Sequence, residues 1–358
     1  MPSSPPAESL YFSTTIPPAL ATLSRTDQVA YVARIGLPPS LSSAPPSVDL
    51  LAQLLLASHT SIPFSSASIH VPPQDWLGEN KPIELRKGPG MELGEGNFKQ
   101  VVEQRQGGYC YSLNPLCAAF LRSFGFRVSE VPARVYLHRG KDPREAGIWW
   151  SPATHVLLIV DWQGSTDRWV FDIGFGGGAS PIPIPLRDGA TCGSLSRSES
   201  FLLRREPLPI GDLQTIPDPA QGWTFYRRVV PAGYTIEDPA QADEGEGFWT
   251  PAFHFQLATL APEDITVANF YSEKHPDAPW TSIFIASLLL PSGARRTLCH
   301  GIPAIERGAP LDGKKYAKLY SKEGIKGDEY DVEWVPFETV PVRDVLEREF
   351  GFRFEQTA

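Results

Sequence analysis

The sequence has little cysteine, and its cysteines do not form a cross-linking pattern. Four cysteines, at positions 110, 117, 192 and 299, are spread over 358 residues. They are too few for the disulfide framework of a small secreted domain, and their spacing matches no common zinc-ligand pattern. We therefore expect no metal centre and a reducing compartment, and we predict a cytoplasmic protein.

The sequence also lacks an excess of positive charge and long apolar runs. It has 41 acidic and 32 basic residues, for a formal net charge of −9. An acidic surface gains nothing from nucleic acid or from an anionic membrane, so we expect neither as a partner. No apolar stretch approaches the ~18–20 residues needed to span a bilayer. The first residues, MPSSPPAESL, lack the basic-then-apolar pattern of a signal peptide.

What the sequence does contain is a change of pattern near Gly125. Before it, apolar residues recur with helical spacing over residues 27–37, 48–59 and 113–124, whereas residues 61–109 read as a Pro- and Gly-rich loop. After it, short β-branched and aromatic segments alternate with turns, which is typical of an antiparallel sheet or barrel. The last quarter of the chain mixes both patterns. This order predicts an α+β chain.

Cys110 is the first candidate for chemistry. It stands in QGGYCYSLN, between a glycine pair and a helix that we expect to begin near residues 112–115. The free N–H groups and the positive dipole end of such a helix start stabilise a thiolate and lower the pKa of the thiol. Gly107 and Gly108 would leave room for a substrate. Buried packing is the alternative, and it is the role we expect for Cys117, which lies inside the apolar stripe.

A thiolate nucleophile needs a base that has an orienting partner. His155 opens the strand-like run HVLLIV and Asp172 closes the run RWVFD, each eight residues from the turn-forming pair Gln163-Gly164. A symmetric hairpin about that pair sets His155 directly opposite Asp172, with both side chains on one face of the sheet. Such a pair can simply tie two strands together. In combination with Cys110, it predicts a Cys–His–Asp triad.

The glycine-rich stretch DIGFGGGA, residues 172–179, has neither the lysine of a phosphate-binding P-loop nor the G-x-G-x-x-G spacing before a helix. We interpret it as a turn that leaves the strand of Asp172. Its glycines would let a ligand approach the backbone closely, so Gly174 and Gly176 are candidates for contact with a cofactor or co-substrate. Phe175 would project beside Asp172.

Together these segments resemble the arylamine N-acetyltransferase family. The family pattern R-G-G-x-C-x-E-x-N compares with residues 106–114, and the family's His and Asp strands compare with THVLLIV and VFDIGFG. Weaker similarities, among them YVARIGL, SHTSIPF, APEDITVANFYS and FGFRF, extend the resemblance over about residues 27–354. Pro-rich inserts around 76–95 and 232–247 indicate an elaborated, fungal-type member.

The resemblance implies three domains: a helical domain (1–126) with the cysteine, a β-barrel domain (127–260) with the His and Asp, and an α/β lid (261–358). It implies a ping-pong reaction in which an acetyl or related short acyl group passes from acyl-coenzyme A, through a thioester on Cys110, to an aromatic amine or hydrazine. Acyl-CoA would be a co-substrate, with no permanently bound cofactor.

The resemblance also implies an apolar, aromatic acceptor site. We expect Phe175 and Val135 to line it, with Tyr109 and Tyr111 next to the cysteine. A malonyl donor would need a cation near the thioester, and Arg105 and Arg134 are candidates, so the identity of the acyl group stays open.

Two positions depart from the family pattern. Gln106 replaces the arginine and Ser112 replaces the glutamate. We expect these changes to alter the loop around the cysteine, and with it catalytic efficiency and substrate choice. Two other functions therefore stay open. One is a cysteine hydrolase or amide synthase that uses the same triad with another acyl donor, and the other is a non-catalytic binding relative.

Overall fold

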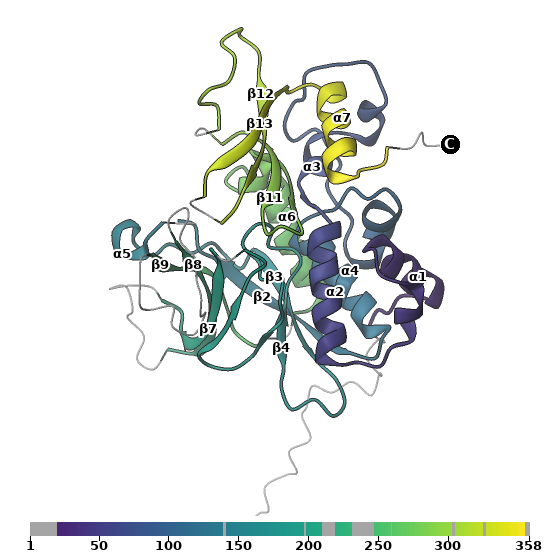
Figure 1. Cartoon of the computed structure of the whole chain (residues 1–358), viewed down its shortest axis with the longest axis vertical. Helices are drawn as coiled ribbons and strands as arrows, with labels where there is room; N and C mark the ends of the chain where they lie inside the picture. The colour runs from purple at the N-terminus through teal and green to yellow at the C-terminus, as the bar shows by residue number, and fades with distance from the viewer. Residues whose placement is uncertain are drawn as a thin grey trace, which may run out of the picture.

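A computed structural model describes residues 20–138, 141–196, 198–209, 219–230, 247–258, 260–302, 305–324 and 327–354. Figure 1 shows three regions: helices α1, α2 and α4 on one side, a large curved sheet beside them, and a second sheet with α7 above both. The mixed architecture is the α+β arrangement that the sequence predicts. Of the insert at 232–247, only Gly247 lies within the described residues.

The three predicted N-terminal helices all form. They are α1 (Arg25–Arg34), α2 (Val48–Ser61) and α4 (Cys110–Arg122), with the short helix η1 (Pro39–Ser43) between the first two. Ser24 and Ser47 cap α1 and α2, because each side-chain oxygen accepts a backbone N–H three residues on. The helices share one core, in which Tyr31 stacks on Phe120 with ring centroids 3.9 Å apart.

Helix α4 begins earlier than the sequence predicts. Its first residue is Cys110 and its N-cap is Tyr109, whereas Pro115 lies in the second turn instead of the first. Ser112 stabilises this early start: its Oγ accepts the Tyr109 N–H at 3.0 Å and donates to the Tyr109 carbonyl at 2.9 Å. Cys110 is therefore part of the helix N-terminus instead of preceding it.

The segment between α2 and α4, interpreted as loop, contains short regular pieces. They are β1 (Phe64–Ser65), α3 (Ala67–His70), η2 (Pro73–Trp76), η3 (Gly94–Asn97) and η4 (Lys99–Glu103). Each is too short for a repeating apolar pattern to reveal it. Strand β1 pairs with β10, which ties this N-terminal segment to the C-terminal sheet.

The large sheet has the strand order β5-β4-β3-β2-β9-β8-β7-β6 and antiparallel pairing. Its strands are β2 (Arg127–Val135), β3 (His155–Asp161), β4 (Trp169–Phe171), β5 (Ile184–Pro185), β6 (Ala190–Gly193), β7 (Ser200–Pro207), β8 (Gln221–Val229) and β9 (Phe248–Phe255), with helix α5 (Pro143–Ala146) between β2 and β3. Edge strands β5 and β6 contact each other, so the sheet curls into a nearly closed barrel. Aromatic rings fill its interior, including Phe225 stacked on Phe253 with centroids 4.7 Å apart.

The second sheet has the order β1-β10-β11-β12-β13. The remaining elements are α6 (Pro262–Lys274), η7 (Pro279–Thr281), β10 (Phe284–Leu289), β11 (Arg295–His300), β12 (Tyr316–Lys322), β13 (Glu329–Pro336) and α7 (Thr339–Phe350). Residues 67–83 pack into the same core as this sheet and α7. The three-domain division stays a prediction, and this core crosses its boundary at residue 126.

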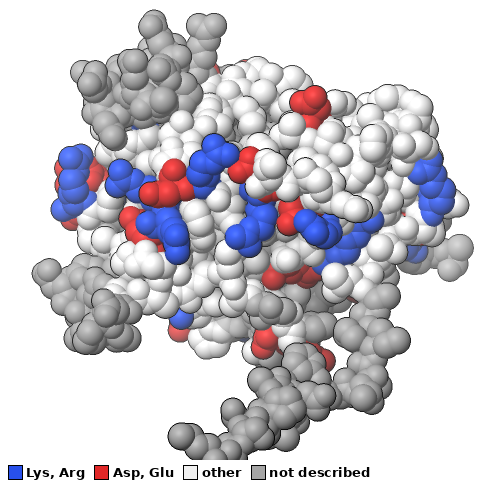
Figure 2. Space-filling view, turned by 90° about the horizontal axis from the view of Figure 1, so that it is seen from below, with Lys and Arg blue, Asp and Glu red and all other residues white. Residues whose placement is uncertain are grey.

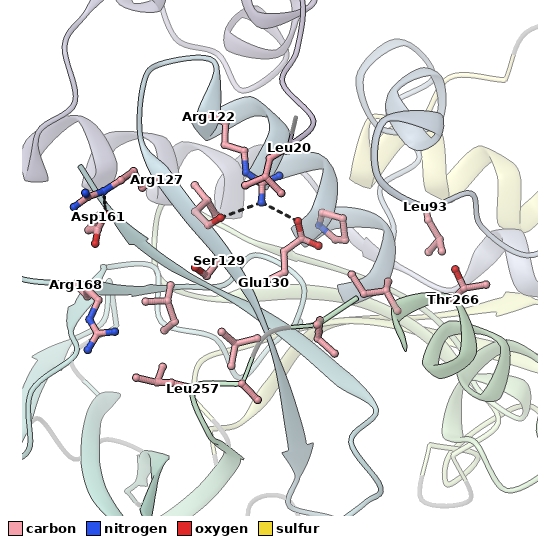
Figure 3. Close-up of a pocket in the computed structure, with 17 residues that line it drawn as sticks. Leu20, Leu93, Arg122, Arg127, Ser129, Glu130, Asp161, Arg168, Leu257 and Thr266 are labelled. Atoms are coloured by element: carbon pink, nitrogen blue, oxygen red, sulfur yellow. Dashed lines mark hydrogen bonds and ion pairs between the residues drawn. The ribbon is translucent and has the colours of Figure 1, made fainter. Parts of the chain in front are cut away.

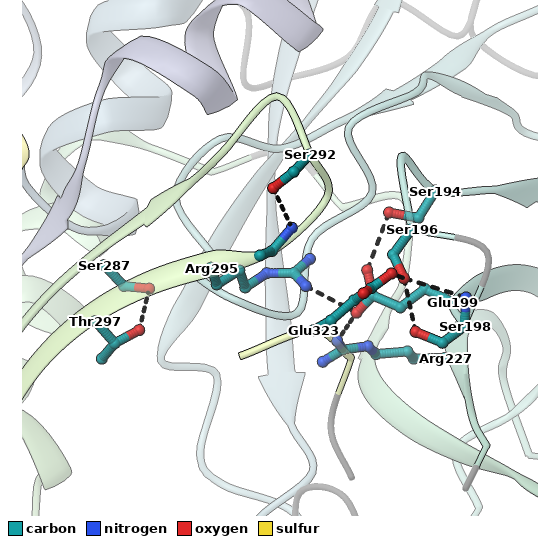
Figure 4. Close-up of polar contacts among 11 residues, drawn as sticks. Ser194, Ser196, Ser198, Glu199, Arg227, Ser287, Ser292, Arg295, Thr297 and Glu323 are labelled. Carbon is teal, nitrogen blue, oxygen red and sulfur yellow. Dashed lines mark hydrogen bonds and ion pairs between the residues drawn. The ribbon is translucent and has the colours of Figure 1, made fainter. Parts of the chain in front are cut away.

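A buried ion-pair cluster joins the barrel to the second sheet (Figure 4). Glu199, next to β7, pairs with Arg227 of β8 and with Arg295 of β11, whose Nη1 lies 2.9 Å from Oε1 of Glu199. The Ser194 hydroxyl donates to Oε2 at 2.9 Å. Because the Glu199 side chain is 0% exposed, its carboxylate depends on these partners in place of water.

Charges of both signs mix on the surface. On the face in Figure 2, basic and acidic side chains lie next to each other, so this face presents no single-sign field that would attract a polyanion. None of the helices in the described ranges combines the length and apolar character that a bilayer crossing requires.

Candidate active site

Cys110 is held against the turn that leaves strand β4. It is 4% exposed and begins α4, where the helix N–H groups have no intrahelical acceptors. Gly174 packs directly on it, because a Cβ at position 174 would clash with the Cα of Cys110. Glycine is therefore what allows this turn to approach the thiol so closely.

His155 and Asp172 form a buried pair, with Nε2 and Oδ2 2.7 Å apart and the two side chains 3% and 5% exposed. The predicted hairpin register is nevertheless wrong by two residues, because β3–β4 pairs Leu158 with Phe171 and Val160 with Trp169. The connecting loop is longer than a two-residue turn. Side chains alternate with a period of two, so the shift leaves both groups on one face, and the carboxylate reaches the imidazole diagonally.

Asn114 fixes the carboxylate of Asp172, and we did not assign it as a site residue from the sequence. Its Nδ2 donates to Asp172 Oδ1 at 2.8 Å and to the Val156 carbonyl at 2.7 Å, while its Oδ1 accepts the Ile173 N–H at 3.0 Å. Gly174 N–H also donates to Oδ1 of Asp172, at 2.8 Å. Oδ2 is thus aimed at the imidazole. Asn114 follows Cys110 by four residues on α4, so both side chains lie on one face of the helix. This spacing is the sequence signal that could have identified Asn114 as a site residue.

The charge of His155 follows from its partners. Burial lowers its pKa, but the negative charge and hydrogen bond of Asp172, together with Cys110, outweigh burial and raise the pKa to about 9. The imidazole is therefore protonated at neutral pH, and a cation beside a thiol favours the thiolate. By contrast, burial raises the pKa of Cys117 to about 12 against an opposing Tyr31 hydrogen bond, so that thiol stays protonated in the core.

A second histidine supports the backbone of Asp172. His59 Nε2 lies 2.9 Å from the Asp172 carbonyl oxygen, so this nitrogen carries the proton and donates it. Burial, opposed by the charge of Asp172, lowers the pKa of His59 to about 4, which leaves it neutral at neutral pH. It steadies the main chain without competing with His155 for the carboxylate.

A cavity of about 500 Å³ opens on the thiol and the imidazole. Of the predicted site residues, Cys110, His155, Gly174, Phe175 and Val135 line it. The other lining residues are mostly apolar and come largely from the C-terminal part of the chain: Phe64, Leu137, Ser151, Pro152, Thr154, Tyr271, Ser272, Asp277, Ala278, Pro279, Trp280, Ile283, Ile285 and Ile302. Phe175 meets the His155 ring edge to face, with centroids 5.1 Å apart.

The substrate contact expected of Tyr109 and Tyr111 stays a prediction. They are 0% and 1% exposed and do not line this cavity. The Tyr109 hydroxyl donates to Asn269 and to Glu273 Oε1, and the Tyr111 hydroxyl donates to the Ala153 carbonyl at 3.4 Å. In these positions both side chains support the start of α4, where Cys110 lies.

Gly176 also lies away from the main cavity. It packs against the ring of Phe64 and lines a separate cavity of about 20 Å³ with His59 and Arg295. Contact of Gly174 and Gly176 with coenzyme A stays a prediction.

A second cavity, of about 740 Å³, contains none of the three candidate catalytic residues (Figure 3). Its charged groups are largely paired: Arg122 Nη2 lies 3.1 Å from Glu130, and Arg127 Nε lies 2.5 Å from Asp161. The thiol–imidazole–carboxylate chemistry therefore belongs to the smaller cavity. Within the described ranges, no group of three or more His, Cys, Asp and Glu side chains could hold a metal ion.

Comparison with known proteins agrees with this geometry. The N-acetyltransferase family pattern matches residues 47–304. The chain is 27% identical to an arylamine N-acetyltransferase of Mycolicibacterium smegmatis, over 70% of this chain and 72% of that protein. It is also 25% identical to the fungal N-malonyltransferase FDB2 of Gibberella moniliformis, over 68% of this chain and 64% of that protein.

The fold is also similar to solved structures. The arylamine N-acetyltransferase of Mycobacterium marinum in complex with CoA superposes with a TM-score of 0.58 at 21% identity, covering 91% of this chain and 92% of that one. The helices, curved barrel and second sheet thus define an acyltransferase fold. The chain belongs to the N-acetyltransferase family.

Proposed function

We propose that the chain is an acyl-CoA-dependent N-acyltransferase that transfers an acetyl or related short acyl group to aromatic amines or hydrazines. The observation that carries the proposal is the buried His155–Asp172 pair, 2.7 Å apart, beside a helix-start thiol in one apolar cavity. Free cysteines at all four positions fit a reducing compartment, and we include a cytoplasmic location in the proposal.

The reaction has two half-reactions. His155 carries the proton, and the thiolate of Cys110 attacks the carbonyl carbon of the acyl-CoA thioester. The new C–S bond forms, the bond to coenzyme A breaks, and the CoA thiolate receives the proton from His155. The amine nitrogen then attacks the acyl-cysteine, its proton passes to His155, and the Cys110 thiolate leaves. Asp172 keeps the imidazole oriented and stabilises its positive charge in both halves.

The two departures from the family pattern are compatible with this role. Ser112 occupies the third helical position, where a glutamate would reach back to the N-cap N–H, and its hydroxyl makes that same bond to Tyr109. Gln106 donates to the Arg353 carbonyl at 3.1 Å and does not line the active-site cavity. These contacts support a catalytic rather than a purely binding protein.

The cavity favours an uncharged acyl group. Neither Arg105 nor Arg134 lines it, and Arg134 Nη1 donates to the Ser151 carbonyl at 3.1 Å. Among the described lining residues, His155 is the only basic side chain, and Asp277 is an acidic one. A malonyl carboxylate would find no arginine or lysine there, and burying an unpaired carboxylate is costly.

The test is covalent labelling in the absence of an amine. Incubation with acetyl-CoA should add one acetyl mass, located by fragmentation on Cys110 in the tryptic peptide 106–122, which also contains Cys117. An added arylamine should discharge the label at the rate of product formation. Cys110→Ser should fold but lose transfer by at least about a thousandfold, because a serine hydroxyl is not ionised by a nearby imidazolium.

Three results would count against the proposal. A label on Cys117, or one that no amine removes, would mean adventitious acylation. Transfer without any covalent label in a single turnover would mean direct attack in a ternary complex. Discharge to water alone would indicate a hydrolase.

A further inference from the structure

One wall of the active-site cavity takes several of its backbone hydrogen bonds from a distant part of the chain. This wall segment, residues 278–285, contributes Ala278, Pro279, Trp280, Ile283 and Ile285 to the cavity lining. It contains the one-turn helix η7 and only the first two residues of β10. The position of its side chains therefore depends on what its carbonyl and N–H groups bind.

Ser66 supplies three of these bonds. Its hydroxyl donates to the Ile283 carbonyl at 2.9 Å and accepts the Ile285 N–H at 3.0 Å. Its own backbone N–H donates to the Ile285 carbonyl at 2.9 Å. The hydroxyl thus uses its proton and a lone pair on two neighbouring points of the wall segment, which fixes the direction of the chain there.

His70 and Arg86 supply two further bonds, in addition to the pairing of the first two residues of β10 with β11. Arg86 N–H donates to His70 Nδ1 at 3.2 Å, so Nε2 carries the proton and donates to the Ile283 carbonyl at 2.9 Å. Burial lowers the pKa of His70 to about 4, although the Ile283 bond opposes it, so this neutral tautomer persists at neutral pH. The side chain of Arg86 donates through Nε to the Thr281 carbonyl at 2.8 Å.

We propose that Ser66, His70 and Arg86 are positioning residues that set the size of the acceptor pocket by holding the wall segment. They touch neither the thiol nor the cavity, since none of them lines it. Through the wall segment they fix where Trp280, Ile283 and Ile285 stand. A loosened wall accommodates bulkier acceptors and contacts small ones less well, without changing the chemistry at Cys110. The assignment of the pocket to an arylamine rests on the proposed function.

The experiment compares Arg86→Met with two matched variants. Arg86→Met removes the Thr281 bond and keeps the backbone N–H that binds His70. Arg86→Lys keeps a donor that can reach Thr281. Arg343→Met removes a similar arginine-to-carbonyl bond, from Nη1 to Trp76 at 3.0 Å, that does not reach the wall segment.

The first readout is the ratio of kcat/KM for a two-ring arylamine to that for a one-ring arylamine. Arg86→Met should raise the ratio about fivefold, the effect of one lost hydrogen bond. Arg86→Lys and Arg343→Met should stay within twofold of the wild type. Acylation of Cys110 by acetyl-CoA should be nearly unchanged in all three variants, which a general loss of structure would not allow.

The second readout needs no acyl transfer: the ratio of Cys110 alkylation rates with N-phenylmaleimide and with the small reagent iodoacetamide. It should rise by a similar factor in Arg86→Met alone. A ratio that does not change in folded Arg86→Met, or that rises equally in Arg343→Met, overturns the inference. If the wild type alkylates but transfers no acyl group, the proposed function fails, and this second ratio still tests whether Arg86 sets the size of the pocket by holding the wall segment.

Discussion

Asp172 acts through both its charge and its fixed orientation. Asn114 and the Gly174 N–H hold Oδ1, and Oδ2 faces the imidazole. The resulting rise in the pKa of His155, from an ordinary 6.5 to about 9, also stabilises the fold. Because the pKa is raised on folding, this contribution is complete below pH 6.5 and is lost as the pH rises through about 9.

Replacement of Asp172 by asparagine should separate the effect of the carboxylate's charge from the effect of its hydrogen-bonding shape. Asp172→Asn removes the main cause that raises the pKa of His155, so the imidazole becomes neutral near pH 7 and Cys110 keeps its proton. The alkylation rate at pH 7 should fall about tenfold or more, since an adjacent opposite charge shifts a pKa by roughly 1–3 units. In the wild type the rate should stay nearly constant from pH 7 to 9, whereas in the variant it should climb with pH.

The matched control is Asp161→Asn, which neutralises a carboxylate paired with the exposed Arg127 at the far end of strand β3. Its alkylation profile should equal that of the wild type. If Asp172→Asn keeps the wild-type profile, Asp172 is structural and the triad assignment is wrong.

Phe175 should influence the acceptor more than the donor. It lines the cavity and packs edge to face on both His155 and Phe253. Phe175→Ala should raise KM for arylamines about tenfold through lost aromatic contact, while acylation of Cys110 by acyl-CoA changes less than threefold. Stopped-flow measurement of the two half-reactions checks this. Equal damage to acylation would assign Phe175 to the donor site or to the support of the imidazole.

At the scale of elements, the start of α4 and the turn after β4 fit together at one point. Gly174 packs on Cys110 and on the side-chain amide of Asn114, so the turn that follows Asp172 lies directly against the helix start that carries the nucleophile. The φ angle of Gly174 is not positive, so the need for glycine here is steric and not conformational. This contact is what brings the residues after Asp172 to the nucleophile.

A methyl group at this contact should therefore disrupt the site. Gly174→Ala should push the turn from the helix start and reduce kcat/KM at least a hundredfold, with a loss of stability of about 1–3 kcal/mol from overpacking. Gly78→Ala is the control, since a Cβ there meets its neighbours at ordinary distances of 3.6 and 3.8 Å. Thermal unfolding and steady-state kinetics measure both. Wild-type activity in Gly174→Ala would mean that the turn is not held closely to Cys110.

At the scale of the whole molecule, the two sheets are joined by charge as well as by apolar packing. Glu199 and Arg227 belong to the barrel and Arg295 to the second sheet, and all three side chains are at most 10% exposed. The aliphatic part of Arg295 also lies against Gly177, in the turn that follows Asp172. The cluster thus connects the joint between the sheets to the active-site turn.

Neutralising the carboxylate should leave two buried guanidinium groups without their counter-charge. Glu199→Gln should cost about 3–5 kcal/mol of unfolding free energy. Glu333→Gln, which breaks an ion pair to Arg348 that is half exposed on both sides, should cost less than about 1 kcal/mol. Chemical denaturation of both variants gives the comparison. Equal small losses would show that the buried cluster contributes no more than a surface pair.

Local patterns in the sequence predict most of the larger elements and the three candidate catalytic residues. Helical periodicity predicts α1, α2 and α4, and alternating β-branched and aromatic segments predict most strands of the barrel, because amphipathic patterns are local. The placement of Cys110 near a helix start also follows from local sequence. So does the prediction that the side chains of His155 and Asp172 lie on one face of the sheet. The prediction of a shared face holds although the predicted register is wrong by two residues, because the side chains of a strand return to the same face every second residue.

The surroundings of those residues depend on tertiary packing and not on local pattern. Asn114 bridges α4 to Asp172, Tyr109 and Tyr111 turn away into the core, and Ser66, His70 and Arg86 reach a wall segment about 200 residues further along the chain. None of these contacts follows from a repeating pattern. They arise where short, irregular segments meet, and which donor finds which carbonyl there depends on the packing of the two sheets and the helices around them.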